Sequence, residues 1–360
     1  MSEITFERAT PKGFYRTLRS RVMKAIKDDG KDITGGSEIQ RKAIILAALY
    51  VVPLVLMFFA MPLWAYFVMW IVAGIGMSGI GMGIMHDANH GSFSKNPTLN
   101  KWLGSSIVML CGNTITWKIQ HNILHHTYTN VHGQDEDVDT GGVIRLHPEQ
   151  PHKKFHRYQH WYGPFLYAIM TLNWLAPKDF KQLVRYKKSG LLDQAGADYA
   201  TEWWKLVLGK LAYIGVLVII PVIFHPQAWY WVILGFLAMH FLAGSLLSWT
   251  FQLAHAMPQT SKFDGFSQKQ LGDWGVHQLL TTANFARNNK LVTWFLGGLN
   301  YQVEHHLFPN ISHIHYPKIA EIVKEVAGEF DLPYIEFPTL GEAIRYHHNY
   351  LRLMGTGATA

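Results

Sequence analysis

The chain alternates long apolar runs with polar segments that are rich in histidine. Residues 43–85 contain no charged side chain, and a second apolar region covers residues 203–254. A single membrane span needs roughly 20 apolar residues. Each region is long enough for two spans and contains a proline turn, at residues 61–63 and 225–227. The pattern therefore predicts four membrane-spanning helices, at about residues 43–61, 63–85, 204–224 and 228–254.

Positive charge is unevenly distributed among the segments between these spans. The two proline turns contain no Lys or Arg, whereas residues 1–42, 86–205 and 256–360 are rich in both. Cytoplasmic loops of membrane proteins carry the excess of Lys and Arg. Both termini and the 86–205 segment are therefore predicted to be cytoplasmic.

Two weaker apolar stretches, residues 102–111 and 161–176, are short or interrupted by Gly, Asn or Pro. We expect them to form interfacial or buried helices rather than spans.

The predicted fold is an all-α integral membrane protein, in which four transmembrane helices carry a cytoplasmic helical cap. Its expected divisions are an N-terminal segment (1–42), a membrane domain (43–320) and a C-terminal tail (321–360).

The net charge of +7 narrows the choice of partner. Only 16% of the residues are charged, against about 25% in typical soluble proteins. Basic charge can attract nucleic acid, anionic lipid or an acidic protein, but no nucleic-acid motif occurs, so membrane lipid is the expected partner. In the N-terminal segment, Phe14, Leu18, Val22 and Ile26 recur every four residues among Lys and Arg. This spacing predicts a basic amphipathic helix on the membrane surface.

Histidines gather at the predicted cytoplasmic ends of the spans and in the cytoplasmic segments. Pairs four residues apart share one face of a helix. His240 differs from these histidines in its position, because it lies inside the last predicted span. We expect it to be a hydrogen-bonded packing residue. The candidate metal ligands are His86, His90, His121, His125, His126, His255, Gln302, His305 and His306.

This number of imidazoles indicates two metal ions rather than one. A zinc site takes three or four protein ligands. Cys111 is the single cysteine of the sequence, so no cysteine pair is available for a metal site, and no H-E-x-x-H motif occurs. Imidazole suits Zn, Cu, Fe and Ni, so the residue type leaves the metal open. Asp87 and the acidic run 135–139 lie near enough in sequence to accept N–H bonds from ligand histidines.

The three clusters resemble the histidine boxes of membrane fatty acid desaturases. The boxes read H-x-x-x-H from His86, H-x-x-x-H-H from His121 and Q-x-x-H-H from Gln302. Their order, spacing and placement beside the spans match, from about residue 40 to residue 320. Gln302 at the start of the third box resembles the front-end subgroup, which desaturates at Δ5 or Δ6. Many members of that subgroup carry a fused cytochrome b5 domain, and no His-Pro-Gly-Gly haem motif occurs here.

The resemblance implies a non-haem di-iron centre that uses O2 as co-substrate to introduce a cis double bond into a long acyl chain. It implies iron ligation by the eight candidate histidines, with Gln302 a weak ligand or a hydrogen-bonding neighbour. His277 competes with His255 for the last ligand position. The implied partners are an acyl lipid, acyl-CoA or acyl carrier protein substrate, and a separate electron donor of the ferredoxin or cytochrome b5 type.

Two other functions remain open at this point. The same centre could serve a membrane lipid hydroxylase or a carotenoid hydroxylase or ketolase, because these reactions also begin by abstracting hydrogen. A metal transporter without redox chemistry is the third possibility. Transporters place polar ligands near the bilayer midplane, whereas these histidines lie outside the predicted spans. The pattern therefore favours an oxidative enzyme.

Overall fold

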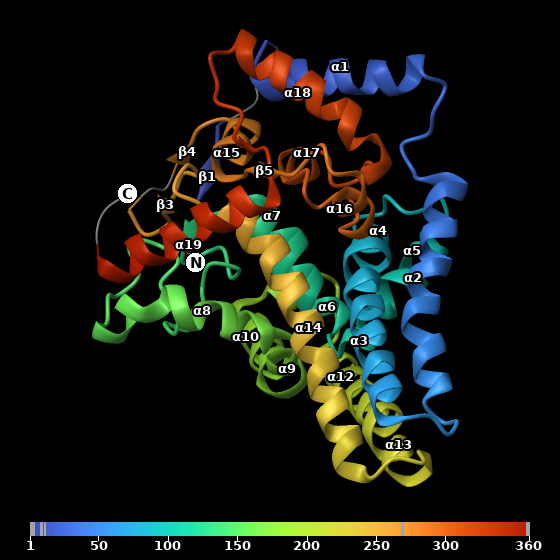
Figure 1. Cartoon of the computed structure of the whole chain (residues 1–360). Helices are drawn as coiled ribbons and strands as arrows, with labels where there is room; N and C mark the ends of the chain where they lie inside the picture. The colour runs from blue at the N-terminus through green and yellow to red at the C-terminus, as the bar shows by residue number, and fades with distance from the viewer. Residues whose placement is uncertain (1–3, 8–9, 11, 268–269, 358–360) are drawn as a thin grey trace.

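The computed structural model of the chain describes residues 4–7, 10, 12–267 and 270–357 (Figure 1). Helices make up most of it, and three short pairs of parallel strands tie distant segments together. The pairs are β1 (Thr5–Phe6) with β4 (Gln270–Leu271), β2 (Val131–His132) with β3 (Phe263–Asp264), and β5 (Asn284–Phe285) with β6 (Glu336–Phe337).

Four helical stretches are long and apolar enough to cross a membrane. The first is Gly36–Leu56 (α2) and the last is Trp229–His255 (α14). The second, Leu63–Asn89, consists of α3 (Leu63–Ile80), the π-helical η1 (Gly81–Met85) and α4 (His86–Asn89). The third, Tyr199–Phe224, consists of α12 (Tyr199–Ile214), the π-helical η6 (Gly215–Ile219) and α13 (Ile220–Phe224). These four helical stretches agree with the number of spans that the sequence predicts. The helix of the first begins at Gly36, before residue 43, and it includes Lys42, which is buried and hydrogen-bonded to His313.

The remaining helices lie above the spans and beside them (Figure 1). Those above are α1 (Phe14–Asp28), α15 (Trp274–Thr281), α16 (Lys290–Phe295), α17 (Gln302–Leu307), α18 (Tyr316–Glu329) and α19 (Leu340–Thr356). The others are α5 (Pro97–Gly104), η2 (Ser105–Leu110), α6 (Thr114–Lys118), η3 (Ile119–His125), α7 (His126–Tyr128), η4 (Lys154–Tyr158), α8 (Gln159–Ala168), α9 (Met170–Asn173), η5 (Trp174–Lys178), α10 (Asp179–Ser189), α11 (Leu191–Gln194) and η7 (His313–His315). The stretches 102–111 and 161–176 fall among these short helices, so neither is a span.

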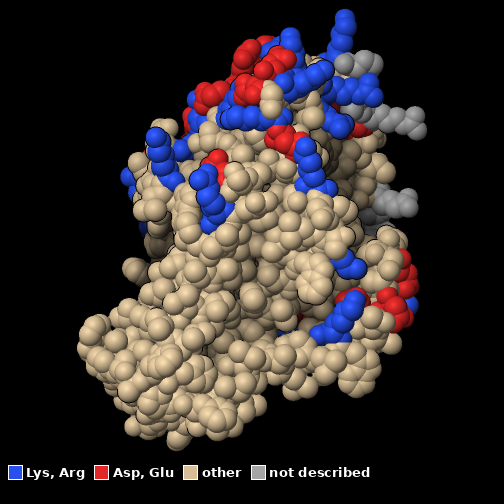
Figure 2. Space-filling model, turned by 90° about the vertical axis from the view of Figure 1, so that its right-hand side faces the viewer, with Lys and Arg blue, Asp and Glu red and all other residues tan. Residues whose placement is uncertain are grey.

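Charge is separated from the apolar spans on the molecular surface. Figure 2 shows Lys, Arg, Asp and Glu gathered on the upper part, with a smaller group at one side. The lower part of this face is almost free of them. Many apolar side chains of the spans are exposed, including Ile44, Val52, Phe59, Trp64 and Phe224. Such a surface is suited to contact with lipid.

The amphipathic N-terminal helix is present as α1, but its predicted position on the membrane surface is wrong. Phe14, Leu18, Val22 and Ile26 are buried in one apolar cluster with residues of α18, such as Val323. The apolar stripe is therefore covered by protein and does not lie on a membrane. Periodicity shows that one face must be buried, and it does not distinguish a neighbouring helix from a lipid surface.

His240 is a packing residue, as predicted. Its Nε2 lies 2.9 Å from the Tyr213 hydroxyl and its Nδ1 lies 2.9 Å from Thr171 Oγ1. Both ring nitrogens are therefore satisfied within the helix bundle, which a buried polar side chain requires.

The first two spans approach each other closely at Gly76. A Cβ atom there would lie 2.3 Å from the backbone nitrogen of Tyr50 on α2. Real Cβ atoms do not approach backbone so closely, and backbone cannot move aside as a flexible side chain can. The contact between α2 and α3 therefore depends on glycine at this position.

We predict that Gly76→Ala destabilises the protein by about 1–3 kcal/mol, the usual cost of overpacking a core. The matched control is Gly215→Ala, because a Cβ there has no neighbour within 4 Å. Thermal unfolding of the two variants in detergent measures the difference. Equal melting temperatures for Gly76→Ala and Gly215→Ala would contradict the close approach of α2 and α3.

Candidate metal centre

Four segments bring the candidate histidines together. His86 and His90 lie at the end of the second span, directly after the π-helical η1, and His255 is the last residue of α14. His121 and His125 lie within the π-helical η3, which continues α6. The side chain of Asn113 begins that helix by accepting hydrogen bonds from two backbone N–H groups. Such π-helical turns are frequent at functional sites, and the sequence spacing did not predict them.

The histidines form two groups on either side of His126. In one group, ligand nitrogens of His86, His90, His121 and His305 lie within 4.8 Å of one another. In the other, those of His125, His255 and His306 meet the same criterion. The His126 ring centroid is 4.8 Å from that of His90 and 4.4 Å from that of His306. Two adjacent groups match the two metal ions that the number of histidines indicates.

The inward-facing nitrogen is Nε2 in both groups. The Nε2 atoms of His90, His125, His255, His305 and His306 are buried without a hydrogen-bond partner among the described residues. The Nε2 atom of His121 lies 3.2 Å from those of His86 and His126. Buried polar atoms are normally satisfied, so this concentration of unpaired nitrogens fits bound metal.

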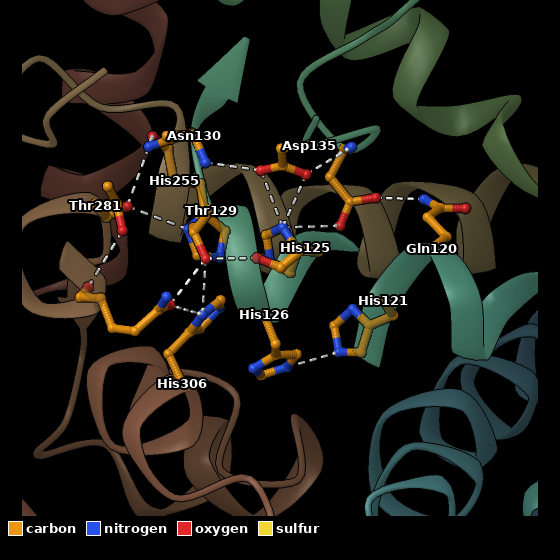
Figure 3. A network of polar contacts seen from close by, with 12 residues as sticks. Gln120, His121, His125, His126, Thr129, Asn130, Asp135, His255, Thr281 and His306 are labelled. Atoms are coloured by element: carbon orange, nitrogen blue, oxygen red, sulfur yellow. Dashed lines mark hydrogen bonds and ion pairs between the residues drawn. The ribbon is translucent and has the colours of Figure 1, made fainter. Parts of the chain in front are cut away.

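The Nδ1 atoms of the second group are held by acceptors from outside it (Figure 3). His125 Nδ1 lies 3.1 Å from both carboxylate oxygens of Asp135. His255 Nδ1 lies 3.3 Å from the Thr281 carbonyl, and His306 Nδ1 lies 2.9 Å from Gln278 Oε1. These oxygens only accept, so each Nδ1 must carry the proton, which leaves the Nε2 lone pair free to bind metal.

The electrostatics of the site favour neutral imidazoles. Burial lowers the pKa of His90, His121, His126, His305 and His306 well below the ordinary histidine value, and neighbouring histidines lower it further. Metal binds the neutral form of the ring. Burial also lowers the pKa of His125, but the carboxylates of Asp135 and Asp137 outweigh it and raise the value to about 9. These carboxylates stabilise positive charge on the ring, whether a proton or a metal ion supplies it.

Asp87 lies beside the first group, where it was expected. Its Oδ1 is 3.6 Å from His86 Nδ1, and its Oδ2 accepts a hydrogen bond of 2.7 Å from His313 Nδ1. The acidic run contributes as well, since Asp135 contacts His125 directly and Gln120 holds Asp137 by a hydrogen bond. Whether Asp87 tunes a metal ligand stays a prediction.

Sequence reasoning missed several residues that orient the ligands. Gln278, Thr281, Tyr316 and His313 each contact a candidate ligand or Asp87, and none belongs to a recognisable spacing. They come from α15, η7 and α18, far from the spans in sequence. Only the folded arrangement reveals them.

The structure also places the two uncertain candidates. Gln302 is buried on α17 four residues before His306, and its Nε2 has no hydrogen-bond partner among the described residues. His277 packs against Phe6 and Phe263, with ring centroids 5.3 Å and 4.8 Å away, and it belongs to neither group. His255, rather than His277, therefore lies with the other candidate ligands.

Comparison with known proteins agrees with this geometry. The family model "Fatty acid desaturase" matches residues 61–338. The sn-1 linoleoyl-lipid 6-desaturase of Arthrospira platensis is 32% identical over 358 residues, which cover 98% of this chain and 95% of that protein. The Delta(5) fatty acid desaturase A of Dictyostelium discoideum is 34% identical over 95% of this chain and 75% of its own length. The chain belongs to the fatty acid desaturase family. It is an oxidoreductase of the front-end acyl desaturase type, as the histidine boxes indicated.

We predict that Asp135→Asn lowers metal affinity about 10–100-fold, the usual effect of losing an outer partner of a metal-binding histidine. An amide can present its NH2 group to His125 Nδ1. The Nδ1 atom would then accept the hydrogen bond and the ring proton would move to Nε2, so Nε2 would have no lone pair for the metal. Metal retained after graded dialysis against a chelator, measured by plasma mass spectrometry, gives the affinity. The control is Asp139→Asn, because Asp139 is exposed and its side chain accepts a hydrogen bond only from the Gly141 N–H among the described residues. Unchanged retention in Asp135→Asn would show that this carboxylate does not hold the ligand.

Proposed function

We propose that this desaturase introduces a cis double bond at Δ6 or Δ5 of a long acyl chain carried by a membrane lipid, at a centre of two iron ions. The observation that carries the proposal is the pair of histidine groups with inward Nε2 atoms, located where the apolar spans end. The names of the relatives support the position of the double bond, since one is a linoleoyl-lipid 6-desaturase and another a Delta(5) desaturase.

The ligand set fits iron held for oxidative chemistry. Imidazole nitrogen suits iron, and no cysteine lies in either group. When bound, the iron pair supplies the reduction of O2 by four electrons to two water molecules, with two electrons from the acyl chain and two from a donor. The candidate ligands are His86, His90, His121, His125, His126, His255, His305 and His306, with Gln302 as a weak ligand or neighbour.

The surrounding residues hold the ligands and exclude water. The Trp117 ring stacks on His121 with centroids 4.5 Å apart, and the Phe251 centroid is 6.0 Å from the same imidazole. Asp135, Thr281 and Gln278 fix the Nδ1 protons on the opposite side. A dry site protects a reactive oxidant from side reactions.

A lipid substrate is supported by space between the spans. A cavity of about 400 Å³ lies among α2, α12 and η6, with apolar walls that include Leu54, Trp70, Val108 and Leu217. A cavity of this size and character suits part of an acyl chain. It extends to Phe58 and His225 beside the two proline turns, and no candidate metal ligand is among the described residues that line it.

We infer that both termini and the histidine groups face the cytoplasm. On the face in Figure 2, Lys and Arg gather on the upper part. Figure 1 shows α4 and α17, which carry candidate ligands, toward the same upper part of the molecule. The positive-inside rule favours this part as the cytoplasmic one. A separate electron donor of the ferredoxin or cytochrome b5 type would then reach the site from that side. The segments 1–42, 43–320 and 321–360 are the proposed divisions of the chain.

We predict that a host expressing the chain forms a new double bond at Δ6 or Δ5 when fed linoleic acid. Gas chromatography with mass spectrometry of derivatised fatty acids locates the bond. His255→Ala should abolish the product because it removes a ligand, whereas His277→Ala should keep most of it at equal protein level. A hydroxylated product would contradict desaturation, and loss of product only in His277→Ala would contradict the ligand assignment.

We predict that removing metal with a chelator abolishes activity and that Fe²⁺ restores it. Zn²⁺ should not restore activity, because zinc has no redox chemistry. Activity is measured with a chemical or enzymatic reductant in the purified system. Restoration by zinc, or full activity of metal-free protein, would overturn the iron centre.

A further inference from the structure

A second cavity lies close to the first histidine group. Its volume is about 410 Å³, within the range of ligand pockets. The beginnings of α2 and α18 and the helix α16 form its walls. Glu38, Lys290 and Trp294 are exposed at its mouth, whereas Lys42 and His313 are buried at its floor. The cavity therefore leads from the surface to a buried ammonium group.

Lys42 retains hydrogen-bonding capacity toward this cavity. Its side chain is only 4% exposed. Its Nζ donates to His313 Nε2 at 2.9 Å, and His313 Nδ1 in turn donates to Asp87 at 2.7 Å. This is the only hydrogen bond of the Lys42 ammonium among the described residues. An ammonium group has three donors, so two remain for an acceptor in the cavity.

A second cation without an ion-pair partner lies at the mouth. Lys290 forms no ion pair within the described part of the chain. Arg287 also lines the cavity, but Glu336 and Glu321 occupy its guanidinium at 2.7 Å and 3.1 Å. Glu38 is the one acidic residue of the lining. Two ammonium groups against one carboxylate favour an anionic acceptor such as phosphate, which lysine binds as a point charge.

The position of the cavity fits the head group of a membrane lipid. Leu291 and Trp294 of α16 are 74% and 38% exposed beside it, and exposed tryptophan is typical of the membrane interface. Only His313 and Asp87 separate Lys42 from His86. An extended chain advances roughly 1.2 Å per bond, so the Δ5 or Δ6 carbons lie about 6–7 Å from the acyl ester. Front-end chemistry thus requires the head group to lie near the histidines, as this cavity does.

We propose that the cavity binds the phosphate of a glycerophospholipid, with Lys42 and Lys290 holding it so that the acyl ester lies beside the first histidine group. The assignment rests on the proposed function and narrows its substrate to phospholipids, in preference to glycolipids and acyl-CoA. Glu38 is placed to meet the hydroxyl or amine at the outer end of the head group.

Isothermal titration of the full-length protein in detergent tests the assignment. The probes are dihexanoylphosphatidylglycerol, dihexanoylphosphatidylcholine, dihexanoyl monogalactosylglycerol, coenzyme A and inorganic phosphate. Both phospholipids should bind more tightly than the galactolipid. Lys290→Gln should weaken phospholipid binding about fivefold, the effect of one lysine at an anionic surface. Lys101→Gln is the matched control, because Lys101 is also exposed but does not line the cavity.

Several results would overturn the site. They are equal binding of the galactolipid, tighter binding of coenzyme A, binding of inorganic phosphate as tight as that of phospholipid, and no effect of Lys290→Gln. The same preparations are assayed for double-bond formation with long-chain phospholipid and galactolipid. A double bond formed without head-group preference overturns the phosphate site and leaves the desaturase function intact. Head-group preference in binding without any double bond supports the site and contradicts the proposed function.

Discussion

The fold brings together eight imidazoles, of which seven are buried and His90 is half-buried. A buried polar atom without a partner costs free energy, and this chain places five such Nε2 atoms in one small volume. A bound cation would offset that cost, and rigid neighbours keep the rings from turning away. The spans supply part of that rigidity, and the acceptors on Nδ1 supply the rest.

The segment above the spans contributes by fixing α17, which carries the last two candidate ligands. Gly297 and Gly298 precede this helix with φ values of 64° and 69°. A Cβ on Gly297 would lie 2.5 Å from the carbonyl oxygen of Met82, which belongs to η1. The turn before α17 therefore packs directly on the π-helical end of the second span. This contact joins the first and third histidine boxes, although more than half of the chain separates them in sequence.

The sequence predicted the features that short-range patterns encode. Apolar length located the four helices that could span a membrane, and the spacing of His86, His121 and His305 with their neighbours located the two histidine groups. The burial of α1 against α18 was not predictable, because an apolar stripe does not identify what covers it. The same limit applies to Gln278 and Tyr316, which reach the histidines only through tertiary packing. Lys42 is the clearest case of this limit. Its buried ammonium group is hydrogen-bonded to His313, which lies 271 residues later in the chain.

The order of the ligands along the chain has a consequence for biosynthesis. Neither histidine group is complete until α17 has emerged from the ribosome, because His305 belongs to one group and His306 to the other. At about 5–20 residues per second, the interval between His86 and His306 lasts roughly 10–40 s. The first two candidate spans are made before that interval and the last two within it, so all four are synthesised before either histidine group is complete. Metal loading is therefore a late event in the life of the nascent protein, and a cell short of the metal would accumulate inserted but incomplete enzyme.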